Sequence, residues 1–197
     1  MILKIAWKFE MTLETLKQQL LPYRGVIRFA VVLVVAHFLW KFTIVGDECG
    51  GEVTLFGCDI TAPFDFMCAH IAQTVYVILL FFGYDVTLSD TFLRFANGNS
   101  VGIIWACSGL KQMFIFACIL ITARGPWRHK LWFVPMGVVA CHVVNVLRIT
   151  LLSVIVCHRP EWFDLMHEHI TKYLFYAIIF LFWVWWEERF NKGKEGE

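Results

Sequence analysis

Charge is scarce in this chain, and it does not gather into a basic face. Only 17% of the 197 residues are Asp, Glu, Lys or Arg, and the formal net charge is +1. Proteins that bind nucleic acid need a clustered basic surface, so we expect no nucleic-acid partner. The sequence also has no CxxC pair, no HxxxH pair in an apolar segment and no nucleotide-binding motif. We therefore expect no cofactor and no metal site.

Long hydrophobic segments make up much of the chain. The chain is 59% hydrophobic and 17% aromatic, and its mean hydropathy is +0.65, a level that soluble domains rarely reach. Apolar segments of about 18 residues or more are typical of transmembrane helices. Five apolar segments are present, at 26–45, 64–83, 101–123, 131–157 and 171–186. They predict an all-α fold, a polytopic transmembrane helical bundle of about five spans.

Two shorter regions have patterns of their own. Residues 1–25 mix charged and apolar side chains, which predicts an amphipathic helix on the membrane surface, and we find no cleavable signal peptide. Residues 84–100 contain Asn97-Gly98-Asn99, a strong turn signal, and predict a short extracytoplasmic hairpin. We find no internal repeat and no linker. The pattern therefore indicates one integral-membrane domain over 1–197.

The distribution of Lys and Arg predicts which loops are cytoplasmic. Basic residues mark the turn between the third and fourth segments and the C-terminal tail as cytoplasmic. Residues 84–100 and 157–170 would then lie outside. Counting back over five spans also puts the N-terminus outside, although it is basic. Either one of the first two segments does not fully cross, or the N-terminal charges do not decide the orientation.

Polar residues interrupt three of the apolar segments. Ala106-Cys107-Ser108-Gly109 lies near the start of the third, Asn145 and Arg148 lie within the fourth, and His167 and His169 precede the fifth. Arg in a membrane-length segment is expensive and marks a candidate functional site. Cys107 would lie roughly 9 Å from the start of the third segment, and Arg148 would lie roughly 26 Å from the start of the fourth. Because a tight turn makes these two segments antiparallel, Cys107, Asn145, Arg148 and His167 are expected at one depth, just below the outer surface.

The chemistry of these side chains suits a nucleophilic site. A thiol becomes reactive when positive charge or a His base stabilises its thiolate. His167 could take the proton from Cys107, and Arg148 could stabilise a developing oxyanion. Asn145 would orient Arg148 or donate a second hydrogen bond, and Gly109 would let a substrate backbone approach. His169 stays open as an alternative base. Lys111, one turn after Cys107, would either lower its pKa or line a cavity.

These motifs resemble the signature of the exosortase/archaeosortase family of integral-membrane cysteine transpeptidases. The matching residues are Ala106-Cys107-Ser108-Gly109, Asn145-Val146-Leu147-Arg148 and His167. The resemblance covers about 83–186, which would be the catalytic core. It implies that Cys107, Arg148 and His167 are catalytic, with Ser108, Gly109, Asn145 and His169 in support.

The resemblance also implies a substrate, a reaction and a location. Family members cleave a C-terminal sorting signal, made of a short motif, a transmembrane helix and a basic tail, from exported proteins. They act through a Cys thioester and transfer the product to an acceptor, which would be a membrane lipid or another envelope component. The chain would lie in the cytoplasmic (inner) membrane with its active site facing the extracytoplasmic side.

Two other functions fit the residues. A small polytopic transporter or assembly factor would use Arg148 to bind an anionic solute, and Cys107 would be incidental. It would keep working with Ser or Ala at position 107, whereas the enzyme would not. A metal- or haem-binding membrane protein would use histidines such as His142 and His158, and we rank it last.

Overall fold

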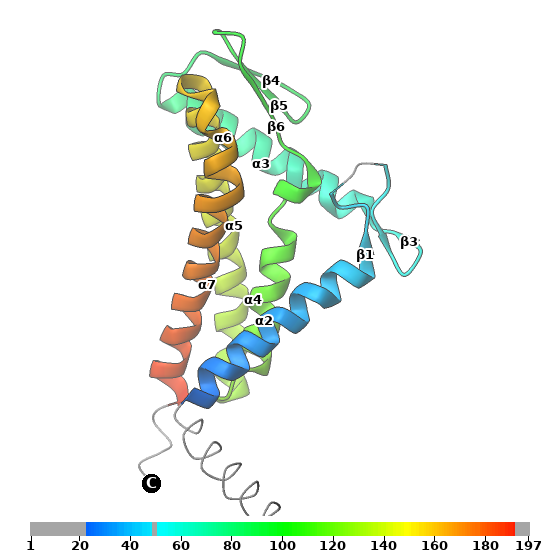
Figure 1. The fold of residues 1–197 in the computed structure, drawn as a ribbon, viewed down its shortest axis with the longest axis vertical. Coiled ribbons are helices and arrows are strands. Elements are labelled where there is room, and N and C mark those ends of the chain that lie inside the picture. Colours follow the sequence, from blue (N-terminus) through cyan, green and yellow to red (C-terminus); the bar gives the residue numbers. More distant parts are fainter. Residues whose placement is uncertain (1–22, 49–50, 192–197) are drawn as a thin grey trace, which may run out of the picture.

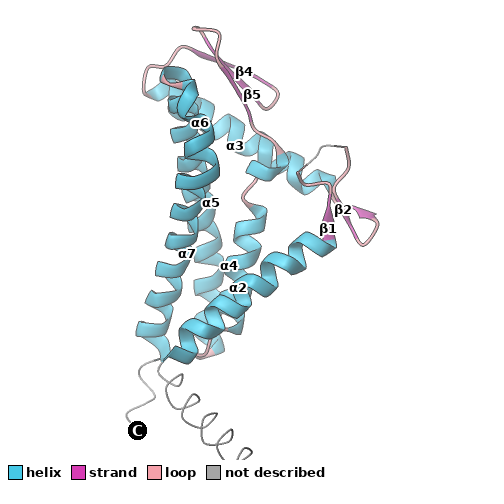
Figure 2. Ribbon diagram, in the orientation of Figure 1, coloured by secondary structure: helices cyan, strands magenta, loops and turns pink. Residues whose placement is uncertain are grey.

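The computed structural model describes residues 23–48 and 51–191, and most of them are helical (Figures 1 and 2). One helix corresponds to each apolar segment, and three of the five start before the expected residue: α2 (Arg24–Thr43), α3 (Thr61–Phe81), α4 (Leu110–Thr122), α5 (Trp127–His158) and α7 (Thr171–Trp186). Three of them, α2, α3 and α5, are long and apolar enough to cross a membrane, and α4 is a shorter apolar helix. The predicted helical membrane bundle is confirmed. The predicted N-terminal amphipathic helix lies outside the described residues.

The helices converge at one end of the bundle and separate at the other. Figure 1 shows α4, α5 and α7 running along the long axis, with α2 meeting them at the lower end and diverging upward. At that lower end the Trp186 indole Nε1 donates a hydrogen bond of 2.8 Å to the Arg124 carbonyl oxygen. A Cβ on Gly25 would lie 3.6 Å from the Trp183 ring. The start of α2, the turn before α5 and the end of α7 are therefore neighbours.

Close packing joins α4 to α5. A Cβ added at Gly137 of α5 would lie 2.1 Å from Cζ of Phe116 on α4, a distance that real Cβ contacts do not show. Phe116 is fully buried, so its ring cannot simply move out of the way. Because Gly137 has no side chain, the two helices can approach closely at this point. The contact between Gly137 and Phe116 therefore fixes the position of α4 along α5.

Helix α3 takes a different course from the other long helices. In Figure 1 it runs obliquely across the upper end of the bundle instead of along its length. Its buried face packs on the upper part of α5 and on a small sheet, in a hydrophobic cluster that includes Ile71, Val75, Leu93, Ile149 and Leu152. A second cluster lies between α2, α4, α5 and α7. The candidate site lies where these two clusters meet.

A three-stranded antiparallel sheet covers the upper end of α5. It consists of β4 (Val86–Ser89), β5 (Phe92–Phe95) and β6 (Ser100–Gly102), in that order. The predicted hairpin is present, with one strand more than expected. The turn also caps the end of α5. Asn97 Nδ2 donates a hydrogen bond to the Cys157 carbonyl oxygen (2.7 Å), and Asn99 Nδ2 donates one to the Val156 carbonyl oxygen (2.9 Å). These side chains satisfy carbonyls that the end of a helix leaves open.

The third apolar segment is only partly helical. We expected it to begin at residue 101, but Val101 pairs with Leu93 in the sheet and α4 starts at Leu110. Pairing with β5 satisfies the backbone of β6, so the chain reaches the bundle as a strand. The expected start was wrong because apolar content alone does not distinguish a buried strand from a helix.

The described part of the connection between α2 and α3 contains three short strands. It forms β1 (Ile44–Val45), β2 (Thr54–Leu55) and β3 (Cys58–Asp59), a small antiparallel sheet beside the upper end of α2. Val53 is fully buried, and its backbone N–H donates to Thr61 Oγ1 (2.9 Å). This packing holds the acidic residues Asp47 and Glu48 close to the bundle.

Candidate active site

Cys107 lies in a tight turn that precedes α4. Residues Trp105–Cys107 form one 3-10 turn, in which the Cys107 N–H donates to the Ile104 carbonyl oxygen (2.7 Å). Gly109 follows in the left-handed region, at φ 76°, and α4 begins at the next residue. The thiol is therefore carried just before the positive end of a helix, a location that favours a thiolate. Cys107 is 8% exposed.

Asn145 fixes this turn from α5. It is fully buried, and its Nδ2 donates a hydrogen bond of 2.8 Å to the Cys107 carbonyl oxygen. A Cβ at Gly109 would lie 2.8 Å from the same Nδ2. We expected Asn145 to orient Arg148 or donate a second hydrogen bond, and Gly109 to admit a substrate backbone. In the structure the two residues contact each other and hold the backbone of the candidate nucleophile.

Arg148 lies one turn further along α5 and is bound to the start of α7. Its Nε donates to Thr171 Oγ1 (3.1 Å), and that hydroxyl donates to the His167 carbonyl oxygen (3.4 Å). Thr171 is 3% exposed. One buried hydroxyl therefore connects the Arg148 side chain to the backbone turn that carries His167.

The two candidate histidines occupy different positions. Both lie in a π-helical turn, Met166–Ile170, between α6 (Phe163–Leu165) and α7. Such turns are rare and often occur at functional sites. The His167 ring stacks on Phe163, with ring centroids 5.2 Å apart, and His167 lines the cavity described next. His169 is exposed and does not line that cavity.

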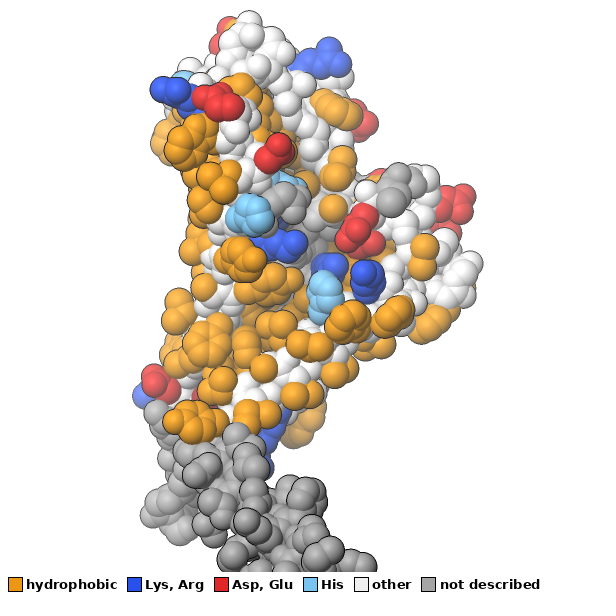
Figure 3. Space-filling model, in the orientation of Figure 1, with side chains coloured by type: hydrophobic (Ala, Val, Ile, Leu, Met, Phe, Trp, Pro, Cys, Tyr) orange, Lys and Arg blue, Asp and Glu red, His pale blue; other side chains and the backbone are white. Residues whose placement is uncertain are grey.

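A cavity of about 400 Å³ lies beside the Cys107 turn. Its walls include Ala106 and Ser108, the two neighbours of Cys107, together with Arg148 and His167. The structure therefore brings the three predicted segments to one cavity. Figure 3 shows charged and His side chains gathered in a hollow between α7 and the upper part of α2, above a hydrophobic surface.

Several walls of the cavity come from residues that the sequence did not single out. They lie on α2, on the connection after it and on α7: His37, Trp40, Lys41, Asp47, Glu48, Lys172 and Tyr176. Those of α2 and its connection lie outside 83–186. Lys111, for which two roles were open, lines the cavity. The only signal in the sequence for the connection is its acidic character between two apolar segments.

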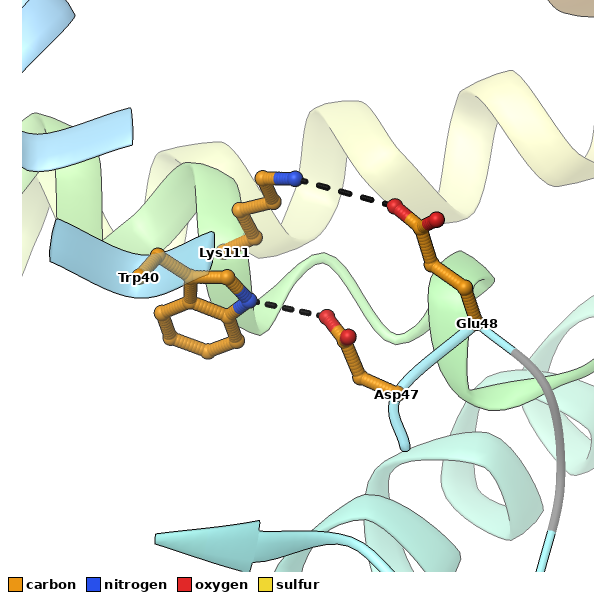
Figure 4. Close-up of polar contacts among 4 residues, drawn as sticks. All are labelled: Trp40, Asp47, Glu48 and Lys111. Carbon is orange, nitrogen blue, oxygen red and sulfur yellow. Dashed lines mark hydrogen bonds and ion pairs between the residues drawn. The ribbon is translucent and has the colours of Figure 1, made fainter. Parts of the chain in front are cut away.

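Two polar contacts attach this connection to the cavity (Figure 4). The Trp40 indole Nε1 donates to Asp47 Oδ2 (2.8 Å), and Lys111 Nζ lies 3.9 Å from Glu48 Oε1. Glu48 is largely exposed, so its ion pair with Lys111 is screened by water and stabilises the fold only weakly. The pair nevertheless brings opposite charges together at the edge of the cavity.

Opposing effects act on the Cys107 thiol. Burial raises its pKa, whereas a hydrogen bond with the Ile104 backbone and the positive charge of Arg148 lower it. Burial is the larger effect, so the neutral thiol predominates near neutral pH. A thiol in this state needs a base to become a nucleophile, and two histidines, His37 and His167, line the cavity.

Comparison with known proteins agrees with this geometry. Residues 55–184 match the family model described as Transmembrane exosortase (Exosortase_EpsH). The chain belongs to the transmembrane exosortase family. The predicted resemblance is confirmed, and the exosortase match runs from β2 almost to the end of α7. No curated protein and no solved structure matches the chain.

Thr171 offers a test of how Arg148 is positioned in this exosortase-family chain. We expect Thr171→Val to lower the rate of substrate processing by about one to two orders of magnitude, because losing a buried hydrogen bond to a charged group costs on the order of 1.5–3 kcal/mol. Thr171→Ser keeps the hydroxyl and should retain most of the rate. A cleavage time course on membranes with matched protein levels measures both. Equal rates for the Val and Ser variants would contradict the positioning role.

Proposed function

We propose that this chain is a membrane-embedded cysteine transpeptidase or protease that cleaves a C-terminal sorting signal from exported proteins. The signal would consist of a short motif, a transmembrane helix and a basic tail. The observation that carries the proposal is the shared cavity, where the Cys107 turn, Arg148 and His167 meet. Family membership supports the same class of chemistry.

The first half-reaction would release the C-terminal part of the substrate. His167 takes the thiol proton while the Cys107 sulfur attacks the scissile carbonyl carbon. Arg148 stabilises the oxyanion of the tetrahedral intermediate. When the intermediate collapses, the C–N bond breaks and His167 returns the proton to the leaving amine. The new N-terminal product is held as a thioester on Cys107.

The second half-reaction would release the product. A hydroxyl or amine of an acceptor attacks the thioester carbonyl, and His167 takes its proton. The C–S bond then breaks, and the proton returns to the Cys107 sulfur. A membrane lipid or another envelope component serves as acceptor in this proposal, and water in its place would give hydrolysis. No external energy source is needed, because the thioester retains much of the free energy of the cleaved bond.

We also propose a membrane orientation for the cytoplasmic (inner) membrane. If α3 lies along the outer interface, α2, α4, α5 and α7 cross, and both chain ends face the cytoplasm. This orientation puts the basic N-terminal residues, the turn at 124–130 and the C-terminal tail on one side, as the positive-inside rule favours. The oblique course of α3 supports it (Figure 1). The candidate active site then faces the extracytoplasmic side.

Reporter fusions test this orientation. A reporter active only in the cytoplasm should be active at both termini and inactive when inserted at Gly57, an exposed position with open space around it. Opposite activities at the two termini would show that α3 crosses the bilayer. The proposed orientation would then be wrong.

Replacement of the nucleophile tests the proposed reaction. We expect Cys107→Ala to abolish processing of a co-expressed reporter with a C-terminal motif, transmembrane helix and basic tail. Cys118→Ala is the control, because Cys118 lies on α4, is partly buried and does not line the site cavity. Immunoblots of membranes with equal expression would show the reporter shift. Equal processing by wild type and Cys107→Ala would overturn the nucleophile and favour the transporter or assembly factor.

A further inference from the structure

A second hollow lies on the other side of the Cys107 turn. It has a volume of about 670 Å³ and is lined by α3, by the β4–β5 turn and by the chain segment that leads to Cys107. It shares Asp47, Glu48 and Trp105 with the site cavity, so the two hollows adjoin. We call this second hollow the sheet groove. The proposed mechanism leaves it without a role.

The sheet groove and the site cavity carry opposite charge. Four carboxylates line the groove, namely Asp47, Glu48, Asp65 and Asp90, and none of the described residues that line it is Lys, Arg or His. The site cavity contains the cations Lys41, Lys111, Arg148 and Lys172, which outnumber the two carboxylates that it shares with the groove. Lys111 faces Glu48 at the boundary, 3.9 Å away. The sign of the charge therefore changes between the two hollows.

Two of the carboxylates, Asp65 and Asp90, lie on opposite elements of the groove, α3 and the β4–β5 turn. Asp65 Oδ1 accepts a hydrogen bond from the Trp105 indole Nε1 (2.7 Å), which fixes its position beside the turn of Cys107. Asp90 occupies the β4–β5 turn with φ 59°, an uncommon conformation that Asp and Asn tolerate better than most residues. Both side chains belong to exposed residues. Their negative charge is therefore available to an occupant.

Apolar side chains complete the surface of the groove. Phe92 and Ile104 are 48% and 54% exposed, although both are large and hydrophobic. The backbone at Ile104 is extended, and Cys107 follows three residues later. An occupant that lies along Ile104 therefore ends close to the candidate nucleophile. Exposed apolar side chains beside charges of one sign are typical of a recognition surface.

We propose that the sheet groove binds the substrate segment on the N-terminal side of the scissile bond and selects a Lys or Arg next to an apolar residue there. The inference rests on the proposed function. The C-terminal side of the scissile bond leads into the substrate's transmembrane helix, which must stay in the bilayer. The groove lies beside the sheet at the upper end of the bundle, so we place the segment on the N-terminal side of the scissile bond there. The carboxylates attract the cation, and Phe92 and Ile104 contact the apolar neighbour.

Peptide binding tests the groove without any cleavage. The probes are fluorescein-labelled peptides of about ten residues, identical except for a central Ile-Lys-Ile, Ile-Gln-Ile or Ile-Glu-Ile. Fluorescence anisotropy with the Cys107→Ala protein in nanodiscs should give about tenfold tighter binding of the Lys peptide than of the Glu peptide at low salt. The Asp65→Asn/Asp90→Asn variant should lose most of this difference. Asn at position 65 keeps an acceptor for Trp105.

A matched variant controls for overall charge. Asp85 and Asp164 are exposed and do not line the groove, so Asp85→Asn/Asp164→Asn should keep the preference for Lys. Equal affinity for the three peptides would contradict the proposal that the groove selects Lys or Arg. The absence of binding at a peptide concentration of about 1 mM would contradict it as well. An equal loss in the control variant also overturns it, because the effect would then come from net charge.

A processing assay separates this inference from the proposed function. Reporters with Lys, Gln or Glu ahead of the cleavage motif are compared in wild type and in Cys107→Ala. If processing needs Cys107 but does not depend on the substituted residue, the proposed function is supported and substrate selection by the groove is contradicted. Lys-selective binding without any processing supports the groove and counts against the transpeptidase. Lys-selective processing that Asp65→Asn/Asp90→Asn abolishes supports both.

Discussion

Arg148→Gln is expected to slow processing of the reporter by about two to three orders of magnitude. Removing one donor from a preorganised oxyanion site costs about 2.7–4 kcal/mol of transition-state stabilisation. Arg148 lines the site cavity and is fixed there by Thr171, so its charge does not need to reorganise during the reaction. Gln keeps a polar side chain of moderate size and loses the charge. Arg148→Lys, which keeps the charge without the planar guanidinium, should lie between Gln and wild type.

The same substitution should change the pH dependence of Cys107. Burial raises the pKa of this thiol, whereas the Ile104 backbone hydrogen bond and Arg148 lower it, so removing Arg148 should raise the pKa further. Only the thiolate reacts with an alkylating reagent, and its fraction rises with pH. The curve of alkylation rate against pH should therefore shift to higher pH in Arg148→Gln. Mass spectrometry of the peptide containing Cys107 gives the rate at each pH.

A surface arginine provides the control for both measurements. Arg159 lies just after α5, is exposed, and pairs with Glu161 at 3.6 Å. Arg159→Gln removes the same charge far from the cavity walls, and processing and alkylation should both stay near wild type. Unchanged processing in Arg148→Gln would remove Arg148 from the proposed chemistry. An unshifted alkylation curve would show that its charge does not act on Cys107.

Much of the bundle could be predicted from hydrophobicity alone. Each apolar segment contains a helix, because a backbone in lipid must satisfy its own hydrogen bonds. The tight turn between the third and fourth segments predicted that Cys107 and the second half of α5 lie near each other, and Asn145 does contact the Cys107 backbone, although helix rise from residue 101 does not apply because α4 starts at Leu110. These features depend on local periodicity and on one short connection. Sequence reasoning is strongest for such features.

The parts that sequence reasoning missed depend on long-range contacts. Residues 101–109 read as part of a span, but pairing with β5 makes the first of them a strand. The connection after α2 had no assigned role, and only its packing brings Asp47 and Glu48 to the cavity. The course of α3 is set by its contacts with the sheet and α5, and no local pattern encodes them. The roles of Asn145 and Gly109 likewise depend on their mutual distance.

Gly109→Ala is expected to abolish most processing while the protein still folds. The substitution has two effects. At φ 76° an L side chain costs about 1–2 kcal/mol, and the new Cβ would lie 2.8 Å from Asn145 Nδ2. Asn145 is fully buried, so it cannot yield without leaving its hydrogen bond to the Cys107 carbonyl. The turn that carries the thiol would shift, and a displacement of about 1 Å can reduce a rate by on the order of a hundredfold.

Gly83→Ala separates the steric effect from the backbone strain. Gly83 has φ 81°, close to that of Gly109, but nothing lies within 4 Å of its added Cβ. Both variants should lose thermal stability in detergent, Gly109→Ala more than Gly83→Ala because of the added clash, and only Gly109→Ala should lose processing and change the alkylation of Cys107. Similar losses of processing in both variants would mean that strain alone explains the effect. The contact between Gly109 and Asn145 would then not be needed to position Cys107 for the reaction, and would only pack α5 against the turn before α4.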